Sequence, residues 1–498
     1  MPLTLQHLTY TYPSCVEPAL ADLSATLPCG WTGLVGDNGC GKSTLARIAC
    51  GLITPDSGSV VPRLFSVYCE QDASAEPEAL YDFAAAYDRD AVALRRALGV
   101  EDDWPWRYDT LSSGQQKRLQ VACVLWQRPD VLVMDEPTNH VDGPTRAALT
   151  EALARFRGIG LLISHDRALL DALCSQCLFM AAGKVTARPG GYSQGRDQAD
   201  RERTTALHDR EQAKRERKRI ASEAQRRREE ASRSAGMRSC RGMDPKDHDG
   251  KGRVKLAIYT GKDGVAGKLS ARMDSRLARA EETLASVRVE KRYDGDLWMR
   301  AEPSPRKVLH RQPELTLPLG DRTLLTPPLT IGHTDHIALT GPNGAGKSTL
   351  VAAIVERLDP AVRTLVIPQE PTAADRQRAL DRLAALDSRS RGRVLAVAAA
   401  LNSDPDRLVE GGETSPGEMR KLMLGLGILD GPELIIMDEP SNYLDLHSVE
   451  ALERLLVGFP GALLLVSHDQ ALLEATTAIR WDIASADNGT ATLTIGWR

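Results

Sequence analysis

The feature that most constrains the fold of this chain is an internal repeat of long motifs. GDNGCGKST and GPNGAGKST, then VLVMDEPTNHVD and LIIMDEPSNYLD, then LLISHD and LLVSHD occur in the same order in the two halves, about 300 residues apart. Several motifs repeated in order at a nearly constant separation indicate a duplicated domain. We therefore expect one domain over residues 1–190, a second over residues 306–498, and a segment of another kind over residues 191–305.

Each repeated domain is predicted to be an α/β domain with a mainly parallel sheet. Short apolar runs such as WTGLVG, VLVMDE and GLLIS alternate with longer stretches in which apolar residues recur at helical spacing. The polar motifs directly follow these runs, and ligands bind at the carboxyl ends of the strands in open α/β sheets. The sequence therefore places the candidate sites at the ends of predicted strands.

The pattern GxxxxGK[ST] occurs twice, each time between an apolar run and a helix-like stretch. Glycines allow backbone N–H groups to turn toward phosphates, and the N-terminus of the following helix favours negative charge. The lysine supplies positive charge to the terminal phosphates, and the serine hydroxyl is a ligand for Mg²⁺. The predicted ATP-binding residues of the loops are Gly36, Asn38, Gly39, Gly41, Lys42, Ser43, Thr44, Gly341, Asn343, Gly344, Gly346, Lys347, Ser348 and Thr349.

Acidic residues at the ends of two apolar runs complete a candidate hydrolytic site in each half. An aspartate at the end of the run is placed to hold Mg²⁺, and the glutamate after it to orient or deprotonate the attacking water. A histidine after a further apolar run is expected to contact the terminal phosphate. The predicted catalytic residues are Glu136, His165, Glu439 and His468. The predicted metal ligands, which include a glutamine from each half, are Ser43, Gln71, Asp135, Ser348, Gln369 and Asp438.

The stretches LSSGQQKR and TSPGEMRK precede the two glutamates and open helix-like segments. With the ordered motifs around them, they resemble the signature motif of ATP-binding cassette proteins. The resemblance implies a head-to-tail closed state with two composite sites, in which the lysine of each half faces the signature of the other. The signature residues implied to bind ATP are Ser112 and Gly114, facing Lys347, and Ser415 and Gly417, facing Lys42.

Three departures from the family pattern predict that the two composite sites are unequal. The resemblance implies that Tyr12 stacks on adenine in the first site, whereas the matching position of the second half is Leu319. Ser113 and Pro416 replace a glycine of the usual signature, and proline has no N–H to donate, although it suits the start of a helix. Both halves keep the lysine, aspartate, glutamate and histidine, so we do not predict that either site is inactive.

The segment between the domains is basic and has the pattern of two helices. Residues 196–300 hold 28 Lys and Arg against 19 Asp and Glu. Heptad and three- or four-residue spacing predicts one helix that ends near Ser234 and another over residues 268–291, as an antiparallel hairpin. A glycine-rich loop over residues 235–267 is expected at the tip, and its length favours a functional role.

Two cassettes joined by a charged helical hairpin resemble the ABC-F family, whose members bind ribosomes and act in translation or antibiotic resistance. The resemblance implies a monomer that closes intramolecularly, with its hairpin in the ribosomal E site, in contact with P-site tRNA and pointing toward the peptidyl-transferase centre. It assigns basic residues to RNA phosphates, where binding depends on charge and counterion release. These residues are Arg215, Lys218, Arg219, Arg226, Arg227 and Arg228.

Resistance by ribosome protection is favoured over a general translation factor. Little chain separates Gln71 from the first signature, which leaves no room for the inserted arm of housekeeping members, and the long tip resembles that of resistance-type members. Met237, Met243 and Tyr259 are the tip residues most suited to act on a drug site.

Three alternatives remain, which are a solvated charged hairpin, the ATPase subunit of a membrane transporter and a DNA-repair cassette protein. No membrane span or signal peptide is predicted, so we expect a cytoplasmic protein. A transporter subunit would not explain the basic hairpin, and a repair protein with zinc modules would need cysteine pairs that the sequence lacks.

Overall fold

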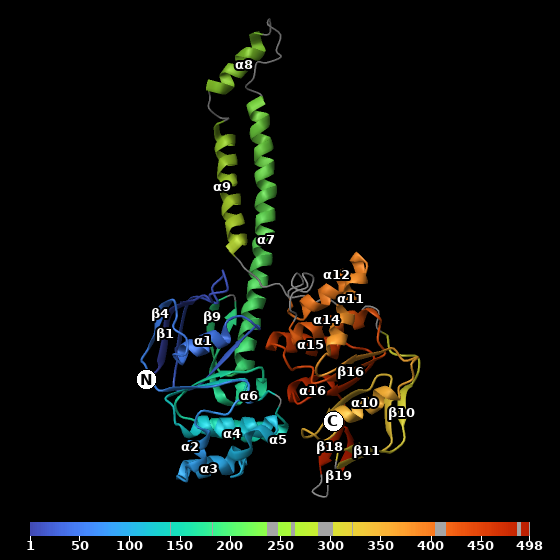
Figure 1. Cartoon of the computed structure of the whole chain (residues 1–498). Coiled ribbons are helices and arrows are strands. Elements are labelled where there is room, and N and C mark those ends of the chain that lie inside the picture. Colours follow the sequence, from blue (N-terminus) through green and yellow to red (C-terminus); the bar gives the residue numbers. More distant parts are fainter. Residues whose placement is uncertain are drawn as a thin grey trace. The chain divides into compact units, whose positions relative to one another are not determined.

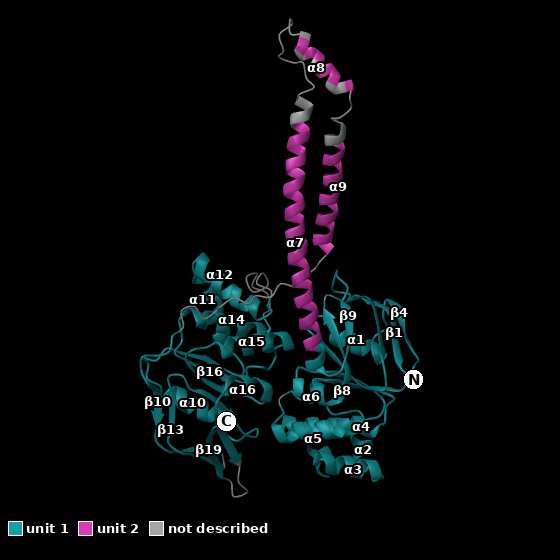
Figure 2. Cartoon of the chain, turned by 180° about the vertical axis from the view of Figure 1, so that it is seen from behind, with its two compact units in different colours: residues 1–195, 293–498 teal, residues 196–292 magenta. Residues whose placement is uncertain are grey.

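The computed structural model describes residues 1–139, 141–181, 183–236, 248–259, 264–286, 302–320, 322–403, 415–485 and 490–497. The chain forms two compact units (Figure 2). One unit consists of Met1–Gly195 and Tyr293–Arg498 and contains both repeated domains; the other consists of Arg196–Arg292.

The first repeated domain, coloured blue to green in Figure 1, contains a six-stranded sheet in the order β5-β6-β7-β3-β8-β9 and a three-stranded antiparallel sheet in the order β2-β1-β4. Strands β5 to β8 of the larger sheet are parallel, and β9 pairs antiparallel with β8. The strands are β1 Leu3–Tyr10, β2 Leu20–Leu27, β3 Gly30–Gly36, β4 Ser57–Val61, β5 Ser66–Cys69, β6 Val131–Asp135, β7 Ile159–Ile163, β8 Cys174–Ala181 and β9 Lys184–Pro189.

Helices cover one face of this sheet, and one helix together with the three-stranded sheet covers the other, so its central strands are buried on both faces. Alternate residues of β6 belong to different core clusters: Leu132 and Met134 to one, Val131 and Val133 to the other. Burial on two sides explains why the central strands are continuous apolar runs. The helices are α1 Lys42–Ala49, α2 Leu80–Ala85, α3 Arg89–Leu98, the 3₁₀ helix η1 Trp104–Thr110, α4 Ser113–Trp126, α5 Gly143–Ala154 and α6 Arg167–Leu173.

The second repeated domain contains an eight-stranded mixed sheet in the order β11-β12-β19-β18-β14-β17-β16-β15 and a two-stranded pair, β10 with β13. The strands are β10 Val308–Gln312, β11 Leu315–Leu319, β12 Arg322–Thr326, β13 Leu329–Gly332, β14 His336–Thr340, β15 Thr364–Ile367, β16 Leu434–Asp438, β17 Ala462–Val466, β18 Ile479–Ser485 and β19 Thr490–Trp497. The helices are α10 Lys347–Glu356, α11 Ala373–Ala385, α12 Ser388–Ala400, α14 Pro416–Leu429, α15 Leu446–Val457 and α16 Gln470–Thr476. The central strands β15, β16, β17 and β14 are parallel, as the sequence predicts.

The second unit begins at Arg196, within the first turns of α7, and is a pair of long helices with a shorter helix between them in sequence. The helices are α7 Tyr192–Gly236, α8 His248–Tyr259 and α9 Gly264–Ser286. An apolar seam joins the two long helices, because Ile220 and Ala224 of α7 are buried with Met273 of α9. Ion pairs between the two helices flank it, Arg217 with Glu281 and Arg228 with Asp274. No helix in the described part of the chain is long and apolar enough to cross a membrane.

The expectation of a continuous tip loop over residues 235–267 is wrong where α8 lies. Two glycines in the first half of α8 disfavour a helix, but the following RVKLAIY supplies helix-forming residues, and Val254 is buried. The predicted second helix over residues 268–291 begins earlier, at Gly264. Its predicted end, together with Met237 and Met243, lies outside the described residues.

Candidate functional site

Each phosphate-binding loop connects a central strand to a helix, β3 to α1 in the first domain and β14 to α10 in the second. The residues before the helices, Gly41 and Gly346, have φ angles of 100° and 95°, a left-handed conformation that suits glycine. At Gly346 a Cβ atom would also lie 2.8 Å from Leu319 Cδ1. The glycines thus let the first backbone N–H groups of each helix face the loop, where an anion binds favourably.

The lysines of the two loops are buried and fold back over their own loops. Lys42 Nζ donates hydrogen bonds to the carbonyls of Gly36 and Asp37, each at 2.8 Å. Lys347 Nζ does the same to the two equivalent carbonyls, at 2.8 and 3.1 Å. Burial lowers the pKa of Lys347. A buried ammonium group bound by neutral carbonyls gains from a nearby anion, so both loops suit a terminal phosphate.

The predicted serine and aspartate ligands for Mg²⁺ lie together in each domain. Ser43 Oγ lies 3.2 Å from Asp135 Oδ2, and Ser348 Oγ lies 2.8 Å from Asp438 Oδ2. Tyr68, which no sequence motif singled out, also donates to Asp135 Oδ2, at 2.5 Å. Hydroxyl and carboxylate oxygens are the ligands that Mg²⁺ prefers, so the donor set fits this ion.

The two candidate catalytic glutamates share an unusual backbone conformation. Glu136 and Glu439 follow β6 and β16 with φ angles of 47° and 46°, in the left-handed region. Their backbone N–H groups bond to the neighbouring strand, and each Oε2 accepts from the backbone N–H of His165 or His468, at 3.2 and 3.3 Å. Strained residues of this kind tend to persist where a site requires a defined side-chain direction.

Burial sets the protonation of these groups. It raises the pKa of Glu136 to about 8 and that of Glu439 to about 7, and lowers the pKa values of His165 and His468 to about 4. A carboxyl group with a pKa near neutrality is suited to accept a proton from water at physiological pH. The Oε1 atoms of both glutamates are buried and make no well-aligned hydrogen bond. The Oε1 atom of Glu136 lies 3.2 Å from His165 Nε2, and that of Glu439 lies 3.6 Å from His468 Nε2. Each Oε1 can therefore accept from a further polar group.

A cavity of about 720 Å³ joins the first phosphate-binding loop to the signature of the second domain. Its volume is within the usual range for small-molecule sites. The residues predicted for this site that line it are Tyr12, Asn38, Gly39, Gly41, Lys42, Ser43, Thr44, Gln71, Asp135, Glu136, His165, Ser415 and Gly417. The structure therefore brings the predicted first composite site together, with Pro416 also in its wall.

The two signature serines cap their helices in the same way. Ser112 precedes α4 and Ser415 precedes α14, and each forms a reciprocal capping pair with the side chain three residues later. Gly114 lies in the first turn of α4.

Near the second phosphate-binding loop, a hydrogen bond links the two domains: Arg146 Nη1 donates to the backbone carbonyl of His468 at 2.8 Å.

The residue predicted to contact adenine and one predicted glutamine ligand of the metal lie beside the first phosphate-binding loop. Tyr12 follows β1, and its hydroxyl lies 2.9 Å from Thr44 Oγ1 in the wall of the first cavity. Gln71 lies in the same wall, and Gln369 follows β15 and is half-buried. In the second loop, the Oδ1 atom of Asn343 lies 3.2 Å from His468 Nε2.

A buried cation five residues after each signature serine was not among the predicted site residues. Arg420 Nη1 donates to the carbonyls of Glu439 and Asn442 at 2.8 and 3.0 Å, and so supports the loop after β16. Lys117 Nζ donates to the carbonyl of Gln71 at 3.1 Å. The recurrence of a basic residue at the same place in both signatures was the available signal.

The predicted RNA-binding residues all lie on α7, and most of them pair with acidic neighbours. Arg228 Nη2 lies 2.8 Å from Asp274 of α9, whereas the other pairs are local to α7. The local pairs are Arg215 with Glu211, Arg219 with Glu216, and Arg226 and Arg227 with Glu230. Exposed pairs of this kind contribute little to stability, so these cations can exchange partners at low cost.

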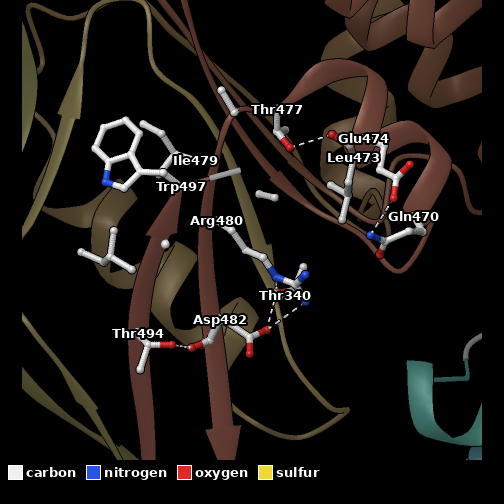
Figure 3. Close-up of a pocket in the computed structure, with 14 residues that line it drawn as sticks. Thr340, Gln470, Leu473, Glu474, Thr477, Ile479, Arg480, Asp482, Thr494 and Trp497 are labelled. Carbon is white, nitrogen blue, oxygen red and sulfur yellow. Dashed lines mark hydrogen bonds and ion pairs between the residues drawn. The ribbon is translucent and has the colours of Figure 1, made fainter.

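A separate cavity of about 400 Å³ lies between α16 and the strands β18 and β19 (Figure 3). Asp482 accepts from Thr340 Oγ1 at 2.5 Å and from Arg480 Nη2 at 3.4 Å inside it. In the first domain the corresponding strand, β8, is covered by the start of α7, where Tyr192 stacks on Phe179 with ring centroids 6.0 Å apart. The phosphate-binding loops do not line this cavity.

Comparison with known proteins agrees with the duplicated architecture. The family model described as "ABC transporter" matches twice, at residues 20–139 and 326–442. The ATP-binding protein Uup of Caulobacter vibrioides is 30% identical over 465 residues, which are 89% of this chain and 70% of that protein. The ribosome protection protein VmlR of Bacillus subtilis is 27% identical, over 89% of this chain and 80% of that protein. The energy-dependent translational throttle protein EttA of Escherichia coli K12 is also 27% identical, over 89% and 85%.

Solved structures share the fold. The chain is similar to an archaeal ribosome recycling factor, aABCE1, solved in complex with the ribosomal stalk protein aP1, with a TM-score of 0.62 and 18% identity. The match covers 98% of this chain and 89% of that one. At this identity the likeness concerns the tandem-cassette fold alone.

Proposed function

Because the chain belongs to the ABC-F family of ATP-binding cassette proteins, we propose that it is an ATPase that binds the ribosome and uses ATP binding and hydrolysis to control that engagement. The observation that carries the ATPase assignment is the first composite cavity. It combines a phosphate-binding lysine, a hydroxyl–carboxylate pair, a buried glutamate and the signature of the opposite domain. Each of these groups has a defined role in phosphoryl transfer to water.

Mg²⁺ and ATP, when bound, supply the charge neutralisation and the reactive phosphoanhydride. Within the chain, Lys42 and Lys347 would bind the terminal phosphates, and the paired Ser and Asp side chains would hold the metal. Glu136 and Glu439 orient the attacking water and accept its proton in their ionised form, and burial, which raises their pKa values, makes each carboxylate a stronger base. The backbone N–H groups of His165 and His468 hold the carboxylates in place.

The ribosome is the proposed partner for two reasons. The names of two relatives, a ribosome protection protein and a translational throttle protein, connect those proteins with translation. The region 196–300 carries an excess of basic residues, which favours a polyanionic partner such as rRNA or P-site tRNA. We place the helical unit in the E site, and expect a cytoplasmic monomer whose domains close around ATP.

Protection against antibiotics at the peptidyl-transferase centre or exit tunnel is the finer proposal. VmlR supports it by its name, and EttA in the same way supports the alternative, a general translation factor. The exposed apolar side chains of α8 favour protection. Leu256 is 65% exposed and Tyr259 is 92% exposed, and such groups are suited to stack or pack against bases near a drug site.

The test is the minimal inhibitory concentration of a panel of such drugs in a susceptible host. Wild-type protein should raise it for at least one drug, and Leu256→Ala/Tyr259→Ala should lose that protection with ATP hydrolysis unchanged, because α8 contains no predicted nucleotide-binding residue. Leu207→Ala, which removes an exposed leucine of α7, is the matched control and should protect like the wild type. Protection by the α8 variant at matched expression would contradict the role of the tip, and no protection by the wild type would favour the general translation factor.

A further inference from the structure

The first phosphate-binding loop makes side-chain contacts with the second domain that the catalytic groups do not require. Asp37 Oδ1 lies 2.8 Å from His447 Nδ1 and accepts a hydrogen bond from Asn402 Nδ2, also at 2.8 Å. The next residue of the loop, Asn38, donates from its Nδ2 to the carbonyl of Tyr443 at 3.2 Å. Three residues of the second domain therefore contact two adjacent residues of the first loop.

These partners lie on well-anchored elements. His447 is in the first turn of α15, and the residue before it, Leu446, is buried in the core cluster of the first domain. Farther along α15, Glu450 accepts from the Tyr192 hydroxyl at 2.7 Å, and Glu453 pairs with Arg167 at 2.8 Å. The start of α15 is thus fixed against the first domain.

Asn402 reaches the loop because it adopts a left-handed conformation, with φ of 61°, just after α12. Asparagine tolerates this conformation better than most residues with a side chain. The equivalent residue after α3 in the first domain is Gly99, with φ of 57°, which has the same backbone but no side chain. The two domains share this turn, but only the second domain has a side chain at this position.

The side chains of Asp37, Asn402 and His447 have no counterpart at the matching positions of the second composite site. Pro342 stands at the position of Asp37 in the second loop, and Gly99 at that of Asn402. Gly143 and Pro144 follow Asp142 where Leu446 and His447 follow Asp445. The duplicated motifs therefore diverge at four positions, and the divergence removes a carboxylate, an amide, an imidazole and an apolar anchor from one side only.

The charges around the cluster favour a protonated imidazole. His447 faces the carboxylate of Asp37 and, on its own helix and cap, Glu450 and Asp445; the hydrogen bond with Asp37 raises the pKa of His447. Burial opposes ionisation of Asp37, but the hydrogen bond and charge of His447, the hydrogen bond from Asn402 and the charge of Lys42 together outweigh it, and the pKa of Asp37 is lowered. The cations near Asp37 are Lys42 of its own loop and Lys421 of α14.

We propose that Asp37, Asn402 and His447 are positioning residues of the first composite site, which hold its phosphate-binding loop against the second domain and make this site close more tightly on ATP than the second. This inference rests on the proposed function, because it assumes that both loops bind ATP. It assigns the inequality of the two sites to contacts across the interface rather than to the catalytic groups, which are the same in both.

The test measures ATP affinity at one site at a time by calorimetry. Lys347→Ala removes ATP binding at the second site, so that only the first site is measured. Lys42→Ala does the reverse. In the Lys347→Ala protein, Asp37→Asn and His447→Gln should each weaken ATP binding about fivefold, as expected for a half-buried ion pair with charge-assisted hydrogen bonds. In the Lys42→Ala protein the same changes should have no effect. Pro144→Ala, at the position that matches His447, is the control and should change neither affinity.

Two further readouts separate positioning from a general loss of structure. The swapped pair Asp37→His/His447→Asp should restore the affinity of the first site for ATP. The loss of affinity caused by His447→Gln should be large at pH 6 and decline as pH rises, because the charged form of a histidine with a raised pKa is lost at high pH. Unchanged first-site affinity in both single variants, or no rescue by the swap, would overturn the inference.

A measurement without nucleotide keeps the two proposals distinguishable. Asp37→Cys/His447→Cys should form a disulfide under mild oxidation if the loop and α15 lie in contact as described. If the disulfide forms but the Lys347→Ala protein does not bind ATP, the proposed function fails at this site and the contact stands. If ATP binds but no disulfide forms, the positioning inference fails alone.

Discussion

At the scale of residues, the buried carboxyl group of Glu136 makes the stability of the protein depend on pH. Its pKa is about 8 in the folded protein and about 4.5 when exposed, so the folded state is destabilised as pH rises from 4.5 through 8. Glu136→Gln should therefore increase the free energy of unfolding by about 2 kcal/mol at pH 8.5 and much less at pH 5. Denaturant unfolding at both pH values without Mg²⁺ and nucleotide measures this. An equal effect at the two pH values would contradict the burial argument.

The chemistry of the candidate sites could be predicted from the sequence, whereas their electrostatics could not. The motifs single out Glu136 and Glu439, because an acidic residue after a strand that ends in aspartate is a recognisable pattern. The left-handed backbone of both residues, and the burial that raises their pKa values, depend on the packing of β7 and β17 around them. A single sequence does not contain that information. Tyr68 and Asn402 were missed for the same reason.

At the scale of elements, periodic patterns were predicted well and irregular ones were not. The three- and four-residue spacing of Met273, Leu277 and Ala280 located α9 and the face that packs on α7. The helix α8 was missed because glycines near its start outweighed a short apolar stretch. Local propensity decides such short helices only weakly, and the packing of residues such as Val254 completes them.

The ion pairs of α7 sharpen the prediction for the proposed RNA contacts. Arg226→Glu/Arg227→Glu should weaken ribosome binding and flatten its dependence on salt by roughly one unit of slope for each phosphate that the variant no longer neutralises. Arg228 is left unchanged because it pairs with Asp274 of the opposite helix, so that its replacement would alter a contact between the helices as well as the surface charge. Glu229→Gln/Glu230→Gln changes the same helical turn and should not weaken binding. Ribosome co-sedimentation at several salt concentrations measures both variants, and an unchanged slope in the arginine variant would favour a merely solvated helix.

At the scale of the whole molecule, the duplication was the strongest information in the sequence. Motif order and spacing were sufficient to predict two α/β domains with their sites at strand ends, and the family comparisons support that architecture. The contacts between the domains could not be derived in this way. Asp37 and His447 are 410 residues apart in the chain, and no motif predicts a contact between them.

The central claim is that two composite sites bind ATP to engage the ribosome and hydrolyse it to release it. Glu136→Gln/Glu439→Gln tests this most directly, because it keeps the phosphate-binding loops and removes only the groups that accept the proton from water. ATP hydrolysis and co-sedimentation with ribosomes are measured on the same preparation, with ATP or ADP. We expect hydrolysis to fall by about 100-fold or more while the variant accumulates on ribosomes with ATP and not with ADP. Hydrolysis near the wild-type rate, or ribosome binding that does not depend on the nucleotide, would contradict this claim.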